Sequence, residues 1–314
     1  MLLTAAKLAL APLLILQGRR VRRLATRLPE AAGEREGLLG VGGVGGVGGD
    51  GGDGAGGGGG GDGGDGGDGG GKPLRLLIVG DSATAGVGAA HQREALAGRL
   101  AERLCERLPA RGLHWRLVAR SGVTTAEALA LLEADGAGAG TRAAAAVFRA
   151  DVAVLAVGVN DVTGQLPVGR WLQRMEAIAH RLEHEHGARL LVVSGLPPMH
   201  LFPALPQPLR WYLGASARRY DRALRRWAVR RPGTVFVPLP AMTDPSVMAS
   251  DGFHPGPPAY SAWAEALAAG VDAAGIDGAA IDGAGTSRSR PAPEPALSAG
   301  GSRADAGGAS PPPG

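Results

Sequence analysis

Four short segments of the chain carry the residue types that chemistry at an acyl group requires. They supply a hydroxyl, a bare backbone amide, a side-chain amide, and an acid close to an imidazole. The residues concerned are Ser82, Gly122, Asn160, Asp251 and His254. A hydroxyl is a weak nucleophile at neutral pH unless a neighbouring base takes its proton. The set therefore indicates nucleophilic catalysis, provided that the fold brings the four segments together.

The glycine-rich turn that follows residues 74–79 does not match three known glycine-rich motifs. A dinucleotide-binding fingerprint needs a third glycine where His91 stands, and a phosphate-binding P-loop ends in Gly-Lys-Ser/Thr, whereas this turn has no lysine. A nucleophile elbow, Gly-x-Ser-x-Gly, fails because Thr84 occupies the place of its second glycine. Ser82 could also simply cap a helix. The three other segments favour the chemical role.

The hydrophobic pattern predicts a scaffold that would position these segments. Apolar runs predict strands at 74–79, 115–119, 151–157, 189–193 and 234–237, and longer periodic stretches predict helices at 92–108, 124–133, 168–186 and 257–269, with an arginine-rich helix between the last two strands. Such alternation favours a parallel sheet that is covered by helices on both faces. Ligands bind such sheets beyond the carboxyl ends of the strands. Ser82, Gly122 and Asn160 come directly after the first three strands.

Taken in order, the four segments resemble the sequence blocks of the SGNH hydrolase superfamily, also called GDSL esterases and lipases. Gly80-Asp81-Ser82 resembles the first block, although Ala83 stands where the family usually has leucine. Ser121-Gly122 resembles the second block, residues 158–161 match the third in full, and residues 251–254 match the fourth. The resemblance covers residues 74–269. It implies a flavodoxin-like, three-layer α/β/α sandwich with a five-stranded parallel sheet, in agreement with the independent strand count.

The resemblance and the chemistry of the side chains together assign roles. Ser82 is expected to attack an ester carbonyl, His254 to remove the serine proton, and Asp251 to orient the imidazole. The backbone amides of Ser82 and Gly122 and the side chain of Asn160 are expected to bind the developing oxyanion. The expected enzyme is a carboxylic ester hydrolase that works through an acyl-enzyme.

Several nearby polar residues are expected to have structural roles. Asp81 and Asp161 are predicted to brace loops by hydrogen bonding. His180 and His184 have the spacing of a metal-binding pair, but the other acidic and histidine side chains nearby diverge on a helix. We therefore expect no metal and no cofactor.

The loop at residues 195–206 follows the fourth predicted strand, so it should border the site. Its apolar side chains Met199, Leu201 and Phe202 are predicted to line an acyl-binding wall. They could equally be core residues at the edge of the sheet. A lipase-like or lysophospholipase-like esterase is the favoured function. The alternatives are a carbohydrate deacetylase or an acyltransferase on the same fold, or a catalytically silent binding module.

Composition sets the limits of the folded domain. The chain has 54 glycines in 314 residues, and 23 of these lie between Gly40 and Gly71. All the aromatic residues lie between Trp115 and Trp263. We therefore predict a hydrolase domain at 72–276, a disordered Gly/Asp linker at 40–71, a disordered tail at 277–314 and a separate N-terminal segment at 1–39.

The remaining features concern partners and location. The net charge of +4 arises largely from arginines in the N-terminal segment and in one amphipathic helix, and no recognition motif accompanies them, so nucleic-acid binding is not expected. The single cysteine, Cys105, excludes an intramolecular disulfide. An apolar stretch followed by five arginines favours peripheral membrane contact through residues 1–27, on the cytoplasmic side. Export, or neither role, stays open, as does the oligomeric state.

Overall fold

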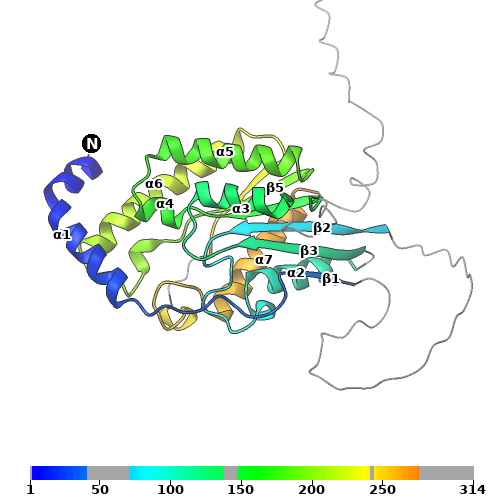
Figure 1. Ribbon diagram of the computed structural model, residues 1–314, viewed down its shortest axis with the longest axis horizontal. Coiled ribbons are helices and arrows are strands. Elements are labelled where there is room, and N and C mark those ends of the chain that lie inside the picture. Colours follow the sequence, from blue (N-terminus) through cyan, green and yellow to red (C-terminus); the bar gives the residue numbers. More distant parts are fainter. Residues whose placement is uncertain (1, 41–70, 110, 138–146, 241–243, 276–314) are drawn as a thin grey trace, which may run out of the picture.

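A single mixed sheet runs through the middle of the structure, which is a computed structural model (Figure 1). It describes residues 2–40, 71–109, 111–137, 147–240 and 244–275. In these parts of the chain, the strands follow the order β1-β3-β2-β4-β5-β6, with the last five parallel and β1 antiparallel to β3. The strands are β1 (Glu36–Leu39), β2 (Gly71–Gly80), β3 (Arg111–Ala119), β4 (Val152–Ala156), β5 (Leu190–Ser194) and β6 (Thr234–Val237).

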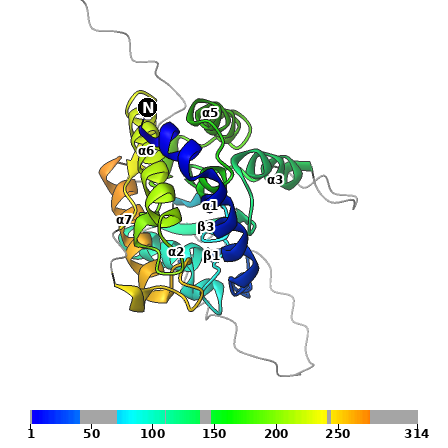
Figure 2. The same cartoon turned by 90° about the vertical axis from the view of Figure 1, so that its left-hand side faces the viewer.

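Helices cover both faces of this sheet (Figures 1 and 2). Helices α3, α5 and α6 pack on one face, and α2 and α7 pack on the other. The α-helices are α1 (Leu2–Leu24), α2 (Leu96–Arg107), α3 (Thr125–Ala137), α4 (Val159–Thr163), α5 (Val168–His184), α6 (Leu209–Val229) and α7 (Pro257–Ala273). Short 3₁₀ helices are η1 (Gln92–Glu94), η2 (Met199–Leu201) and η3 (Pro245–Val247). This is the predicted three-layer sandwich.

The central strand β2 shows why the sequence folds in this way. Successive side chains of a strand point to opposite faces. Leu77 and Val79 therefore join the core under α3, α5 and α6, whereas Leu76 and Ile78 join the core under α2 and α7. All four side chains are completely buried. A strand that is apolar at every position is what a sheet covered on both faces requires.

The five parallel strands are those that the sequence predicts, and the intervening helices also match the prediction. The predicted tail at 277–314 lies outside the described residues, as does the predicted linker apart from its two end residues. Helix α1 is 23 residues long. None of the described helices combines the length and the apolar character needed to cross a bilayer.

The sixth strand, β1, comes from upstream of the segment to which the sequence analysis confined the folded domain. Gly37 lies opposite Trp115 in the antiparallel pairing of β1 with β3. The carboxylate of Glu36 accepts hydrogen bonds from His114 Nε2 at 2.7 Å and from Arg116 Nε at 2.9 Å. These contacts cover the edge of β3 that would otherwise be exposed.

We expect Gly37→Val to destabilise the fold, because a Cβ at this position would lie 2.7 Å from the indole nitrogen of Trp115. Urea unfolding should show a loss of about 1–3 kcal/mol. Leu38→Val, at an exposed position of the same strand, is the matched control and should change stability by less than about 0.5 kcal/mol. Equal stabilities for the two variants would mean that residues 36–39 do not belong to the sheet.

Candidate active site

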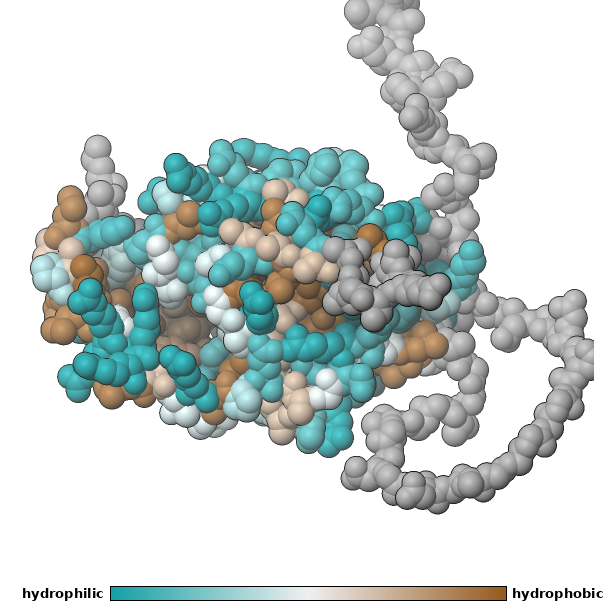
Figure 3. Space-filling model, viewed as in Figure 1, coloured by the Kyte–Doolittle hydropathy of each residue, from teal (hydrophilic) through white to brown (hydrophobic). Residues whose placement is uncertain are grey.

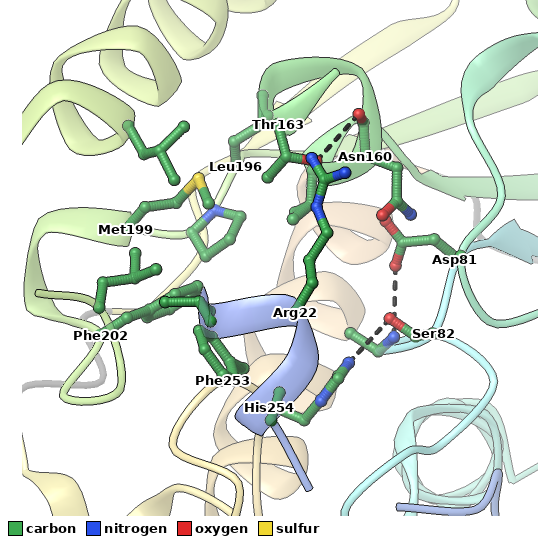
Figure 4. A pocket seen from close by; sticks show the side chains of 18 of the residues that line it. Arg22, Asp81, Ser82, Asn160, Thr163, Leu196, Met199, Phe202, Phe253 and His254 are labelled. Atoms are coloured by element: carbon green, nitrogen blue, oxygen red, sulfur yellow. Dashed lines mark hydrogen bonds between the residues drawn. The ribbon is translucent and has the colours of Figure 1, made fainter. Parts of the chain in front are cut away.

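Ser82, His254 and Asp251 form a continuous chain of hydrogen bonds at the carboxyl edge of the sheet, and Figure 4 shows the bond between Ser82 and His254. The distance between Ser82 Oγ and His254 Nε2 is 2.8 Å, and that between His254 Nδ1 and Asp251 Oδ2 is 2.6 Å. Ser82 belongs to the turn after β2, whereas the other two residues lie in the loop before α7. In this geometry the imidazole can take a proton from the serine while the carboxylate fixes its tautomer.

The loop that carries Asp251 and His254 is held by the aspartate itself. Asp251 Oδ1 accepts hydrogen bonds from the backbone N–H groups of Phe253 at 2.9 Å and His254 at 3.0 Å, and Gly252 adopts φ +69° within this turn. Burial acts to raise the pKa of the Asp251 carboxyl, but the hydrogen bonds from the imidazole and the two backbone groups outweigh it and lower the pKa. Asp251 is therefore ionised when His254 accepts a proton.

The turn that presents Ser82 depends on Gly80, the last residue of β2. A Cβ there would lie 2.0 Å from Thr84 Oγ1 and 2.5 Å from the carbonyl oxygen of Ala156. The Thr84 hydroxyl donates a hydrogen bond to that same carbonyl at 3.1 Å. The absent side chain at residue 80 thus lets the turn close tightly against the end of β4.

Gly122 and Asn160 line the same cavity as Ser82. Gly122 adopts φ +81°, and a Cβ on it would project into open space. Among the described residues, nothing accepts a hydrogen bond from the backbone N–H groups of Ser82 and Gly122. Asn160 Nδ2 donates to the carbonyl oxygen of Val123 at 2.9 Å, which fixes the amide and leaves its second hydrogen for a ligand. These groups can serve as an oxyanion hole.

Asp161 secures the loop after β3, as the sequence predicts. Its two carboxylate oxygens accept hydrogen bonds from the backbone N–H of Thr125 at 2.9 Å and from the Thr125 hydroxyl at 2.8 Å. The carboxylate is buried, and burial raises its pKa. The α4 segment thus holds the loop that contains Gly122 through two consecutive residues, Asn160 and Asp161.

Asp81 lies buried directly beneath the nucleophile turn. Its Oδ1 accepts a hydrogen bond from the backbone N–H of Ala83 at 3.3 Å. Burial raises the pKa of this carboxyl from 3.8 to about 6, against the lowering effect of this hydrogen bond and of the nearby His254. Its position agrees with the expected role as a brace for the turn.

A cavity of about 890 Å³ opens above Ser82. Met199 and Phe202 line it, as the sequence predicts, and both also belong to the hydrophobic core (Figure 4). Leu201 does not line it. The prediction for Leu201 is wrong because η2 turns this side chain outwards, where 38% of it is exposed. Phe253 adds a further apolar side chain beside the histidine.

Helix α1 forms one wall of this cavity, which was not predicted from the sequence. Leu14 is buried against α6, with Leu10 and Val21 beside it, and Arg22 lines the cavity. The spacing of 10, 14 and 21 is that of one face of a helix, and this was the signal that could have revealed the contact. It was obscured because residues 8–16 are apolar on every side of the helix, which also suits contact with a membrane.

Within the part of the chain that the structure describes, no group of three or more His, Cys, Asp or Glu side chains could hold a metal ion. The rings of His180 and His184 stack on each other with centroids 3.9 Å apart. His184 Nδ1 hydrogen-bonds to the carbonyl oxygen of His180 at 2.9 Å.

A serine, a histidine and a buried aspartate joined by hydrogen bonds, with N–H donors beside them at the carboxyl edge of a parallel sheet, have the geometry that serine hydrolysis requires. Residues 78–262 match the model of the GDSL-like lipase/acylhydrolase family. The chain belongs to this family, which confirms the resemblance carried by the four motifs.

Similarity to individual proteins is more distant. The chain is 30% identical to a GDSL-like esterase of Mycobacterium tuberculosis over 205 residues, which is 62% of this chain and 60% of that protein. It therefore spans less than two thirds of this relative's length. A lipase from a goat rumen metagenome is 19% identical, with a TM-score of 0.48 over 63% of this chain and 97% of that one. A carbohydrate esterase from Corynascus thermopiles is 18% identical, with a TM-score of 0.46 over 64% of this chain and 66% of that one.

The raised pKa of Asp81 predicts a pH-dependent stability. The folded state binds this proton more tightly than the unfolded state, so the contribution of Asp81 to the free energy of unfolding should fall as the pH rises from about 4 to about 6, by up to about 1.4 kcal/mol per pH unit. Asp81→Asn keeps a hydrogen-bond acceptor but cannot ionise. Urea unfolding at several pH values should show that the free energy of unfolding of the Asn variant increases relative to that of the wild type between about pH 4 and about pH 6. The difference should stay constant above about pH 6. Parallel stability profiles would contradict the burial of an ionisable group here.

Proposed function

We propose that this protein is a serine esterase that hydrolyses carboxylic esters through an acyl-enzyme. The observation that carries the proposal is the continuous hydrogen-bonded chain from Ser82 Oγ through the His254 ring to Asp251. A binding module would not need this arrangement. The family of the chain supports the same reaction class.

Ser82 Oγ attacks the ester carbonyl while His254 Nε2 takes its proton. The tetrahedral intermediate then collapses, the bond to the alcohol breaks, and the imidazolium returns the proton to the leaving alcohol. A water molecule, deprotonated by the same nitrogen, attacks the acyl-serine, and the acid leaves as Ser82 regains its proton. Asp251 stays ionised and stabilises the imidazolium in both halves of the reaction.

The oxyanion of both intermediates is bound by the backbone N–H groups of Ser82 and Gly122 and by the amide of Asn160. Each donor is held in place before substrate arrives. Asn160 is fixed through Val123, and the loop of Gly122 is fixed through Asp161. Donors that need no reorganisation contribute most to the rate, and loss of one typically costs about 10²- to 10³-fold.

The substrate we infer is an ester with an apolar acyl group. Met199, Phe202 and Phe253 give the cavity a largely apolar wall, and its volume is sufficient for an acyl chain. This favours a lipase-like or lysophospholipase-like activity. A carbohydrate deacetylase or an acyltransferase would use the same three residues, and these alternatives differ in the acyl group they accept and in the acceptor.

Ser82→Ala should lower kcat/KM for p-nitrophenyl esters at least about 10³-fold, because the nucleophile is lost while the binding site is kept. Ser121→Ala is the matched control, since Ser121 lines the same cavity but does not contact His254, and its rate should stay near that of the wild type. Equal activity of the wild type and Ser82→Ala would rule out the assignment of the nucleophile.

The same assay over acyl chains of two to sixteen carbons separates the substrate classes. We expect rates to rise from acetate to medium chains as the apolar wall is filled. A sharp preference for acetate would favour the deacetylase alternative. Transfer of the acyl group to an added alcohol in preference to water would favour the acyltransferase.

We also propose that the outer face of α1 makes peripheral contact with membranes. This face leaves Leu8 74% and Leu16 63% exposed, with arginines nearby. Hydrophobic side chains cover this end of the molecule in Figure 3, beside long hydrophilic ones. Such a surface suits the interface of a bilayer that contains anionic lipids.

The double variant Leu8→Gln/Leu16→Gln should bind vesicles of phosphatidylcholine with phosphatidylglycerol at least about 10-fold more weakly than the wild type in flotation assays. Leu38→Gln, at an exposed position of β1 at the far end of the molecule from α1, is the control and should float like the wild type (Figure 1). Equal flotation of all three proteins, or none by the wild type, would contradict membrane contact through α1.

A further inference from the structure

Helix α1 is fixed over the active-site cavity by specific contacts with the rest of the fold. The side chain of Gln17 donates to the carbonyl oxygen of Gln207 at 2.7 Å and accepts from the backbone N–H of Leu209 at 3.1 Å. Leu209 is the first residue of α6, so Gln17 satisfies an otherwise free N–H at the start of that helix. Leu14 packs into the same core with only 8% of its surface exposed. The orientation of α1 is therefore defined, and so is the face it presents to Ser82.

That face brings positive charge to the cavity. Lys7, Arg19, Arg22 and Arg27 all line it, whereas Arg20 and Arg23, on the other side of the same segment, do not. Within the described residues, none of these four cavity-lining side chains has a hydrogen-bond or ion-pair partner. On α2, by contrast, Arg103 and Arg107 are paired with Glu265.

The negative groups that line the cavity do not balance this charge. They are the carboxylates of Asp81 and Asp251. Asp251 is engaged with His254, and Asp81 is buried beneath the turn. Glu30, the acidic residue close to the second motif, is engaged with Arg35 and with the backbone N–H of Ser121.

Of these four basic side chains, that of Arg22 is the one seen in the close view of the cavity. Figure 4 shows its side chain extending from α1 into the cavity, with Met199 and Phe202 on one side of it and Asn160 and Ser82 on the other. A guanidinium presents several N–H donors in a plane and binds carboxylates and phosphates with two parallel hydrogen bonds. It has no such partner within the described residues and is exposed to the cavity and to solvent, so it is free to bind an anionic group of a substrate in the cavity.

We propose that Arg22, supported by Arg19 and Arg27, selects esters that carry a negatively charged substituent, a carboxylate or a phosphate. This inference rests on the proposed esterase function and specifies, in addition, that the substrate is anionic. The substrate would then be amphiphilic. Its acyl chain would lie along the wall of Met199 and Phe202, and its anion would lie against the inner face of α1.

The test compares neutral and anionic esters of matched shape with the full chain. One pair places the charge on the acyl side: p-nitrophenyl pentanoate and the p-nitrophenyl monoester of glutaric acid. The other places it on the alcohol side: a monoacylglycerol and its glycerol phosphate ester with the same acyl chain. The pair that shows the larger preference for its anionic member identifies the source of the anion.

In the favoured pair, Arg22→Gln should lower kcat/KM for the anionic ester about 10- to 100-fold more than for the neutral one, mainly through KM. Arg23→Gln removes the same charge from the adjacent, outward-facing position and should leave the ratio at the wild-type value. Equal loss for both members of each pair, no loss with either, or a wild-type preference for the neutral esters would overturn the proposal.

Binding to the Ser82→Ala protein separates this proposal from the proposed function. In that background, calorimetry with the monoacylglycerol phosphate and with glutarate should show at least one ligand bound about 10-fold more weakly after Arg22→Gln, and not after Arg23→Gln. If the wild type hydrolyses none of the four esters, the proposed esterase function is wrong. The calorimetric affinities would then still show whether Arg22 binds the anion. Unaltered binding and unaltered ester selectivity would leave the esterase standing and remove the anion site.

Discussion

The whole site depends on β2 lying between β3 and β4 in parallel register. Gly80 pairs with Ala119 on one side and with Ala156 on the other, so three strands end at the same level. Three short turns therefore leave the sheet side by side, and they carry Ser82, Gly122 and Asn160. Buried hydrogen bonds then join the turns, from Thr84 to the end of β4 and from Asp161 to Thr125. The register itself is strongly specified, because a slip of one residue would move every side chain of the strand to the other face of the sheet.

The fourth turn comes from a distant part of the chain, but it carries both Asp251 and His254, so these two residues are positioned relative to each other by local contacts. Only two residues lie between Asp251 and His254, and one carboxylate binds both the backbone of the turn and the imidazole ring. The acid thus shapes the loop and orients the base at once. Only one contact across the fold, from His254 to Ser82, then has to be made correctly.

Much of this arrangement could be predicted from the sequence because it is encoded in local signals. Fully apolar runs mark strands buried on both faces, and polar residues directly after them mark a site. Three features could not be predicted in this way. Residues 36–39 join the sheet through pairing with β3, which no local pattern records. The direction of Leu201 depends on a single 3₁₀ turn. The spacing of residues 10, 14 and 21 marks a buried face of α1 but not what it packs against, because the position of α1 depends on long-range contacts of Gln17 and Leu14.

Covalent labelling is the most direct measurement of the central claim that Ser82 is activated by His254 and Asp251. The full chain would be treated with diethyl p-nitrophenyl phosphate, which phosphorylates an activated serine with release of p-nitrophenol, and then digested and examined by mass spectrometry. The account predicts one stoichiometric diethylphosphoryl adduct on Ser82, lost when His254 is replaced by alanine. Absence of an adduct, an adduct on another residue, or equal labelling of the His254→Ala protein would contradict it.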